Sequence, residues 1–294
     1  MIEYRVIGLR LPEVKFGDDI ADLIVEASRE IGGLQDNDVV VVTSKVISKA
    51  KGYMISLDKV KPSRKAFRIA RVTRKDPKLV QAILDHSEKI VAIIPVAEAL
   101  RESDFHRRFS RYPEVALKVI EKDPTILLVE TCKGELLTDA GIDSSNVPPG
   151  YLSYPPPDPD KEAREIREKI KRKTGKRVAV VITDTEFTIS RFGSVDIAIG
   201  VSGLDPIDRN FASPDLYGKP KYGGVDLIAD EIAAAAALLM KQAAEKIPVA
   251  IVRGLDYDKR EVSIKDILIP SRIIRKTLIK TILTTVKCRI LKII

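Results

Sequence analysis

The chain has 294 residues, of which 45% are hydrophobic and 31% charged, with a mean hydropathy of -0.03. This composition excludes a disordered chain and a multispanning membrane protein, and the length allows one large domain or two smaller ones. The net charge of +8 fits a nucleotide partner as well as a nucleic acid, because basic residues are spread among acids except near the C-terminus.

Short apolar runs bounded by turn residues predict buried strands. In chain order they cover residues 39–42, 90–94, 126–129, 178–182, 195–201 and 249–252. Helical patterns between them cover residues 19–31, 77–86, 158–174 and 225–246. Strands and helices alternate without regular βαβ units, so the sequence predicts an α+β (mixed α/β) fold.

The predicted helix over 158–174 has the clearest boundaries. Asp158 and Pro159 supply a cap and a first-turn proline, and Gly175 closes the other end. The proline-rich segment 151–160 cannot lie inside a helix, so we expect an extended crossover between two halves of the chain.

The ends of the chain and its cysteines indicate the cellular compartment. Met1 to Arg5 include an acid and a base, so we expect no signal peptide and a cytoplasmic protein. Cys132 and Cys288 lie far apart in the sequence, and reduced thiols are expected. Abundant Lys, Glu, Arg and Ile without Trp resemble proteins of thermophiles.

Two aspartates occupy positions suited to a divalent cation. Asp184 follows the apolar run 178–182, and Asp143 follows the turn at Gly141. Strand ends expose functional groups, and the carboxylate of Asp184 beside the hydroxyl of Thr185 offers oxygen ligands that Mg²⁺ or Mn²⁺ prefers. A capping or turn role is the alternative for each aspartate.

The segment 44–49, directly after the tetra-valine run, combines hydroxyl and ammonium groups. At the end of a strand such groups can contact phosphate, although a solvated basic loop has the same composition. The P-loop, dinucleotide-binding, hydrolase and kinase motifs are absent from the sequence, so a nucleotide would be bound in another way.

Ten short segments carry the strongest functional signal. They are, in chain order, Gly17 to Asp19, Val42 to Ala50, Ala140 to Val147, Pro156 to Asp160, Thr174 to Val178, Ile182 to Thr185, Ala198 to Gly203, Asp215 to Gly218, Ala229 to Ala233 and Val252 to Gly254. In this order they resemble the coenzyme F420:L-glutamate ligases, the gamma-glutamyl ligases of deazaflavin biosynthesis, in their archaeal form.

The resemblance implies a GTP-dependent ligase that joins L-glutamate through an amide bond to the phosphate-bearing deazaflavin precursor or a related acceptor. It implies two divalent cations, Mg²⁺ or Mn²⁺, stimulation by K⁺, and an intertwined homodimer with mixed and antiparallel sheets. On this basis residues 1–255 form a catalytic domain of two interlocked halves, 1–150 and 151–255, followed by a basic extension over 256–294.

The resemblance also assigns residues by position. The implied metal ligands are Asp143, Asp184, Thr185 and Gln242. The implied nucleotide-binding residues are Ser44, Lys45, Lys49 and Asn146, together with Met240, Gln242 and Ile247 in the segment after the last long helix. The implied catalytic residues are Asp143, Asp184 and Arg191.

The chain departs from the family pattern at several positions. Gln242 offers a neutral oxygen where a carboxylate is usual, and 241–246 favours a continued helix over a glycine-rich loop. Residues 186–191 keep one arginine position, Arg191, and lose another. Asp139 replaces an asparagine, as an extra ligand or a salt-bridged residue. These departures support a second hypothesis, a non-catalytic paralogue that keeps the scaffold and binds nucleotide or metal.

The tail 270–294 holds seven basic residues and no acid, interspersed with aliphatic residues. A basic amphipathic helix can lie on a membrane, but a terminal helix that packs on the body or on a partner subunit has the same pattern. We expect packing, and neither a nucleic acid nor a membrane as a partner.

Overall fold

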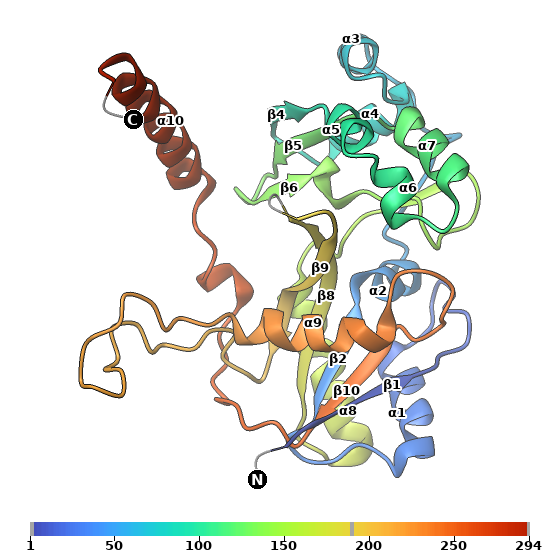
Figure 1. Cartoon of the computed structure of the whole chain (residues 1–294). Helices are drawn as coiled ribbons and strands as arrows, with labels where there is room; N and C mark the ends of the chain where they lie inside the picture. The colour runs from blue at the N-terminus through green and yellow to red at the C-terminus, as the bar shows by residue number, and fades with distance from the viewer. Residues whose placement is uncertain (1–2, 189–190, 293–294) are drawn as a thin grey trace. The chain divides into compact units, whose positions relative to one another are not determined.

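The computed structural model describes residues 3–188 and 191–292, which form two compact units (Figure 1). The first unit comprises Met1–Met54 and Ser144–Ile267, and the second comprises Ile55–Asp143 and Leu268–Ile294. Each unit is therefore built from two separate stretches of the chain, whereas the sequence analysis divided the chain linearly. The predicted mixed α/β fold with mixed and antiparallel sheets is confirmed.

The first unit is built on a five-stranded sheet. Its strands, in spatial order, are β1 (Arg5–Leu9), β10 (Val249–Arg253), β2 (Val39–Thr43), β8 (Ala179–Phe187) and β9 (Ser194–Ser202). Strands β2 and β8 are parallel, with Thr43 opposite Thr183, and the other neighbouring pairs are antiparallel. Because parallel neighbours end at the same edge of a sheet, the residues that follow Thr43 and Thr183 lie close together.

Helices cover both faces of this sheet (Figure 1). Val40 and Val42 pack with α1 (Ile20–Ser28) and α8 (Pro159–Thr174) on one face, and Val39 and Val41 pack with α9 (Ile228–Met240) on the other. Alternate residues of a strand point to opposite faces. The uninterrupted run of valines therefore follows from burial on both sides.

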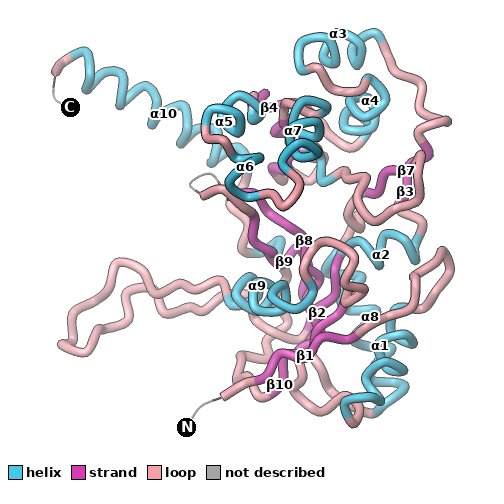
Figure 2. The backbone as a smooth tube through the Cα atoms, turned by 45° about the vertical axis from the view of Figure 1, so that its right-hand side comes forward, coloured by secondary structure: helices cyan, strands magenta, loops and turns pink. Residues whose placement is uncertain are grey.

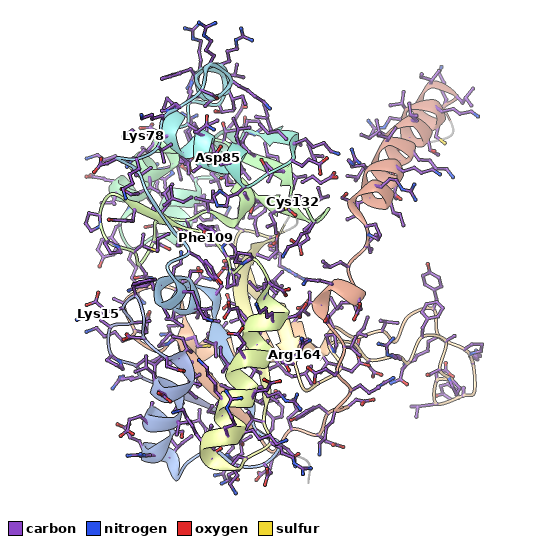
Figure 3. All side chains as sticks on the ribbon, turned by 180° about the vertical axis from the view of Figure 1, so that it is seen from behind. Lys15, Lys78, Asp85, Phe109, Cys132 and Arg164 are labelled. Atoms are coloured by element: carbon purple, nitrogen blue, oxygen red, sulfur yellow. The ribbon has the colours of Figure 1, made fainter. Side chains whose placement is uncertain are left out.

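The boundaries of α8 confirm the predicted capping. Asp158 Oδ1 accepts a hydrogen bond from the Lys161 backbone N–H at 3.2 Å, and Gly175 ends the helix with φ 72°. Arg164 is on the solvent side of the helix (Figure 3). Gly200 of β9 leaves room for the first turn of α8, because a Cβ there would lie 2.5 Å from Pro159 Cβ.

The second unit contains an antiparallel three-stranded sheet of β4 (Lys89–Ile94), β5 (Ile126–Glu130) and β6 (Leu136–Thr138). Its helices are α3 (Arg64–Thr73), α4 (Pro77–Asp85), α5 (Val96–Glu102), α6 (Phe105–Phe109), α7 (Pro113–Lys122) and α10 (Ser271–Ile290). The remaining short elements of the chain are β3 (Met54–Ser56), β7 (Tyr151–Ser153), η1 (Arg29–Ile31), η2 (Asp139–Gly141) and η3 (Ile264–Asp266).

Lys75 is a fully buried cation in the second unit. Its side chain is 0% exposed and forms ion pairs with Asp123 and, at 3.0 Å, with Asp139. Burial raises the pKa of Asp139, which the charge of Lys75 and the Leu127 backbone N–H oppose. A buried ammonium requires such partners. Of the two roles expected for Asp139, the salt-bridged one is confirmed.

Two local predictions are wrong. Residues 44–49 are not a solvated loop, because they lie in α2 (Ser44–Lys51), where Ser44 and Ser48 are buried. Helix α9 ends at Met240 instead of continuing to residue 246, because Lys241 adopts φ 51° and ψ -163°, which a helix cannot accommodate.

Cys132, labelled in Figure 3, and Cys288 are free thiols, as predicted. Within residues 3–188 and 191–292, no helix combines the length and the apolar character needed to cross a membrane.

Asp19 links α1 to α8. Its side chain accepts hydrogen bonds from the N–H groups of Ala21 and Asp22, and its Oδ2 accepts one from Lys169 Nζ at 2.8 Å. Burial acts to raise the pKa of Asp19, but Lys169 and the two backbone groups outweigh it and lower the pKa.

We expect Asp19→Ala to lower the free energy of unfolding at neutral pH by about 1–2 kcal/mol, measured by urea denaturation. The folded-state pKa is lowered, so this contribution is present above the ordinary value of 3.8 and is lost as pH falls through the folded-state pKa. The difference in the free energy of unfolding between wild type and variant should therefore become smaller at acidic pH. Glu26→Ala, which removes only the exposed ion pair with Arg29, is the control. An Asp19→Ala effect independent of pH would contradict this account.

Candidate functional site

The candidate site lies where β2 and β8 end in the first unit. Helix α2 begins directly after β2, and Asp184 follows Thr183 on β8. Ser44 Oγ donates a hydrogen bond to Asp184 Oδ2 at 2.8 Å, and the Thr185 backbone N–H donates to Asp184 Oδ1 at 2.8 Å. Two predicted groups 140 residues apart in sequence are thus in direct contact.

The start of α2 offers donors to an anion. The side chain of Thr43 at the N-cap makes no hydrogen bond to the first turn. Backbone N–H groups at a helix N-terminus favour phosphate. Lys45, half-buried in the first turn, donates from Nζ to Ser153 Oγ at 2.9 Å, and Lys49 follows one turn later, also half-buried.

Asp196 of β9 completes the acidic side of the site, and sequence reasoning missed it. It is 5% exposed, lies opposite Thr185 in the strand register, and accepts a hydrogen bond from Thr185 Oγ1 at 3.1 Å. Burial raises the pKa of Asp196, and the charge of Asp184 raises it further. A single acid inside the apolar run 195–201 was the available signal.

The charged form of Glu186 is disfavoured in the same way as that of Asp196. Burial raises its pKa first, and the charge of Asp184 adds to the shift. Carboxylates brought together with raised pKa values are typical of functional sites. The oxygens of Asp184, Thr185 and Asp196 fit a hard divalent cation such as Mg²⁺ or Mn²⁺. Among the described residues, no group of three or more His, Cys, Asp or Glu is placed to hold a metal ion.

The segment after α9 is tied to the same region of the first unit. Asn146 Nδ2 donates to the carbonyl oxygens of Gln242 and Ala243 at 3.5 and 3.3 Å, and Gln242 Nε2 donates to Ser194 Oγ at 3.4 Å. The nearby amide of Gln242 acts to lower the pKa of Asp196, against the larger effect of burial. The structure therefore brings the predicted residues Asn146 and Gln242 together.

Met240 and Ile247, at the two ends of this segment, have packing roles. Met240 is 3% exposed in the core beneath α9, and Ile247 is partly buried against the same core. Their side chains pack in the core and so hold both ends of the segment against it. Contact of either residue with a nucleotide stays a prediction.

The surroundings of two predicted catalytic residues, Arg191 and Asp143, do not indicate a role. Arg191 is exposed between β8 and β9, and its carbonyl oxygen accepts a hydrogen bond from the Thr188 hydroxyl at 3.0 Å, while residues 189 and 190 lie outside the described chain. Asp143 is exposed and belongs to the second unit. The catalytic roles of both stay predictions.

Comparison with known proteins identifies the family. A family model described as F420-0:Gamma-glutamyl ligase matches residues 8–254. The chain belongs to this family. The match begins in β1 and ends after β10. It includes every residue of the candidate site, and α10 lies outside it.

Relatives of this gamma-glutamyl ligase family support the match along most of the chain. The coenzyme F420:L-glutamate ligase of Methanothermobacter thermautotrophicus is 39% identical over 248 residues, covering 84% of this chain and 87% of the relative. That of Archaeoglobus fulgidus is 39% identical over 246 residues, covering 84% and 85%. That of Methanocaldococcus jannaschii is 35% identical over 252 residues, covering 85% and 87%.

We expect Asp196→Asn to stabilise the metal-free protein at neutral pH, because it removes a buried negative charge near Asp184 and keeps an oxygen for the Thr185 hydroxyl. The raised folded-state pKa means that the favourable contribution of Asp196 is complete below the ordinary value of 3.8 and is lost as pH rises through the folded-state pKa. As pH rises from the ordinary pKa through the folded-state pKa, the wild type should lose stability and the variant should not.

Thermal unfolding in EDTA, followed from acid to neutral pH, measures this difference. The gain in melting temperature at neutral pH should be about 2–4 °C, as for roughly 1 kcal/mol in a chain of this size. Asp226→Asn, an exposed aspartate of the same unit, is the matched control. A variant less stable than wild type at every pH would show that Asp196 is favourably paired.

Proposed function

We propose that this protein is a GTP-dependent ligase that forms an amide bond between L-glutamate and the coenzyme F420 precursor or a related phosphorylated acceptor. Membership of the gamma-glutamyl ligase family and the similarity to coenzyme F420:L-glutamate ligases support it. The observation that carries the chemistry is the contact between Ser44 and Asp184, in which a helix N-terminus meets a carboxylate and hydroxyl pair at a sheet edge.

Amide formation requires an activated carboxylate. The γ-phosphoryl group of GTP moves to a carboxylate oxygen of the acceptor, which gives an acyl phosphate and GDP. The glutamate amine then attacks the acyl carbon, loses a proton, and inorganic phosphate leaves. Both steps move negative charge between oxygens, so catalysis depends on positioning and on charge neutralisation.

The residues of the first unit suit these requirements. The N–H groups at the start of α2 bind phosphate oxygens, and Lys45 and Lys49 add positive charge. Asn146 holds the 241–247 segment in place through two backbone carbonyls. Arg191 supplies a further cation for the acyl phosphate.

We assign one divalent cation, Mg²⁺ or Mn²⁺, to Asp184, Thr185 and Asp196 of the first unit. Gln242, a neutral donor beside Asp196, would hold a second cation more weakly, and K⁺ would act as an activator. Such cations neutralise phosphate charge. The retained Asp184 and Thr185 and the additional Asp196 favour a ligase over a non-catalytic paralogue.

Glutamate-dependent phosphate release from GTP with the deazaflavin precursor measures the proposed activity. We expect Ser44→Ala to lower kcat/KM about tenfold, because Asp184 loses a donor that orients it. Ser48→Ala is the matched control, since Ser48 is equally buried in α2 but donates to the Tyr154 carbonyl at 2.7 Å. It should leave kcat/KM within about twofold of the wild-type value.

Asp184→Ala should abolish both this turnover and the rise in melting temperature that Mn²⁺ with GTP produces. Equal losses in Ser44→Ala and Ser48→Ala would place the chemistry elsewhere. A wild-type protein that binds GTP but releases no phosphate with any acceptor would favour the non-catalytic paralogue.

We further propose a homodimer, which an arm of the first unit supports. Residues 205–227 form a long excursion between β9 and α9 that projects from the sheet of that unit (Figure 2). Its most exposed apolar and aromatic side chains are Phe211, Leu216, Tyr217 and Tyr222, of which Leu216 is 99% exposed. Long loops with exposed aromatic residues are typical of interfaces.

We expect the double variant Leu216→Asp, Tyr217→Asp to shift the protein from dimer to monomer, because charged side chains cannot be buried against a partner without large cost. Light scattering at micromolar concentration measures the molar mass. Lys219→Ala on the same arm is the control and should remain dimeric. A wild type that is already monomeric would reject the homodimer.

A further inference from the structure

Helix α10 lies outside the segment that matches the ligase family and takes no part in the proposed reaction. Its first turn is attached to the second unit, where Ser271 is 5% exposed and Arg275 Nε lies 3.4 Å from Glu130 Oε2. From Lys276 to Ile290 the side chains are exposed or half-exposed. The predicted packing of this helix on the body of the chain is therefore limited to its start.

One side of α10 is aliphatic. Its side chains, each 48–74% exposed, are Leu278, Ile279, Ile282, Leu283, Val286 and Ile290. Their spacing of one, three and four residues confines them to an arc of about 140° on a helix of 3.6 residues per turn. An isolated helix that exposes such a stripe to water has an unmatched apolar surface.

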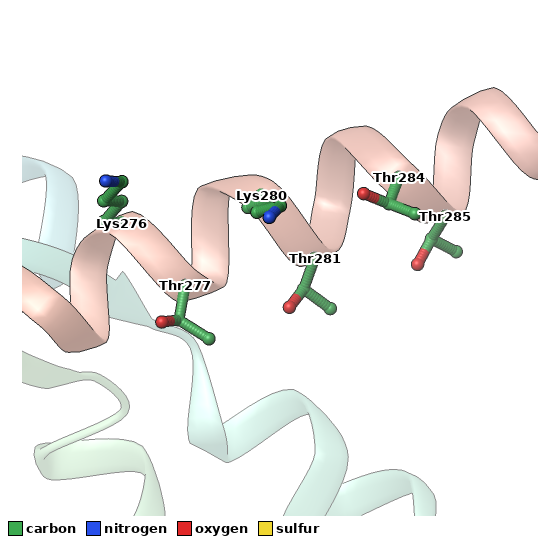
Figure 4. Close-up of a pocket in the computed structure, with 6 residues that line it drawn as sticks. All are labelled: Lys276, Thr277, Lys280, Thr281, Thr284 and Thr285. Carbon is green, nitrogen blue, oxygen red and sulfur yellow. The ribbon is translucent and has the colours of Figure 1, made fainter.

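The rest of the circumference is polar and has no acid. Lys276, Lys280 and Lys287 follow one edge of the stripe, and the side away from it carries threonines. Figure 4 shows Thr277, Thr281 and Thr285 along the helix together with Lys276 and Lys280. The hollow beside these residues is lined by α10 alone, so it lacks the second wall that a small-molecule pocket requires.

The charge of the chain is concentrated in this region. Residues 270–294 contain seven basic residues and no acid, and the whole chain has a net charge of +8, which leaves +1 for residues 1–269. A partner that matches the surface of α10 must therefore be both anionic and apolar. Another copy of α10 would oppose six positive charges with six more, and the remainder of a second copy carries no net negative charge.

We propose that α10 binds an anionic membrane surface, lying in the plane of the lipid headgroups with its aliphatic stripe toward the acyl chains. Lysines at the edge of the stripe keep their ammonium groups at the headgroups while their methylene stems cover apolar surface. Attraction between basic side chains and anionic lipids adds to burial of the stripe. The attachment of the first turn through Ser271 and Arg275 makes α10 an anchor for the protein.

The aliphatic stripe distinguishes this partner from a nucleic acid. A helix that binds phosphate backbones uses its basic side chains and needs no apolar arc. In the membrane arrangement the stripe and the lysine edge contribute together. Loss of either should then release the protein.

Flotation of the full-length protein with vesicles rich in phosphatidylglycerol, compared with vesicles of phosphatidylcholine alone, tests the proposal. We expect binding to the anionic vesicles that weakens as salt is added. The triple variant Lys276→Gln, Lys280→Gln, Lys287→Gln should bind about a hundredfold more weakly. The double variant Ile282→Ser, Leu283→Ser should lose at least about tenfold.

The matched control is Thr281→Ser, Thr285→Ser, on the threonine side of the same helix, which should bind like the wild type. Melting temperatures of all variants should equal that of the wild type, because these side chains are exposed. Phosphate release should also be unchanged, so failure of the membrane proposal is separate from failure of the proposed function.

Three results would overturn the proposal. Equal flotation with both kinds of vesicle, or none with either, excludes an anionic membrane. Sensitivity to the lysine variant but not to the Ile282 and Leu283 variant, with binding to a duplex DNA probe, indicates a nucleic acid. A change of molar mass in the Ile282 and Leu283 variant without vesicle binding indicates a second copy of the chain.

Discussion

The parallel pairing of β2 with β8 is the constraint on which the candidate site depends. It pairs residues that lie 140 positions apart in sequence, as in Val39 opposite Ala179, and it ends both strands at one edge of the sheet. This register places the start of α2 beside Asp184, and the antiparallel pairing of β8 with β9 then places Asp196 opposite Thr185. A shift by one residue would turn these side chains to the opposite face.

The packing on the two faces of the sheet explains why this edge can be rigid while remaining polar. On one face, α9 contributes mainly alanines, including Ala229, Ala233 and Ala236, which allow its backbone to approach the strands closely. On the other face, α1 and α8 contribute larger side chains such as Ile24 and Ile170. The strands are thus held from both sides, and the polar groups are confined to their ends, where hydrogen bonds satisfy them.

The sequence predicted β2, β8, β9 and β10 of the first unit, because residues buried on both faces form apolar runs that leave little ambiguity. It also predicted Asp184, whose position after such a run is a local property. It did not predict β1, whose residues are mostly half-exposed. Asp196 was missed because its importance comes from its position opposite Thr185 in the register of β8 and β9, and the apolar run 195–201 does not indicate which residue of β8 it faces. The end of α9 was missed for a related reason, since the alanine-rich pattern continues past Met240 while Lys241 turns away.

The short helices were predicted least well. Helix α2 is short and five of its eight residues are polar or basic, so its formation depends on burial of Val46 and Ile47 against the sheet. The three helices between residues 96 and 122 were not predicted as elements. The division into two discontinuous units depends on long-range contacts, which composition and periodicity do not report.

The buried Lys75 has a consequence for how the second unit unfolds. Its partners Asp123 and Asp139 come from positions 48 and 64 residues further along the chain, and Asp139 also accepts the Leu127 N–H of β5. Partial opening at either end would leave an ammonium group or a carboxylate in an apolar interior without its partner. Intermediate states are therefore costly, and the interaction makes the connection from α3 to α4, strand β5 and η2 a single cooperative block.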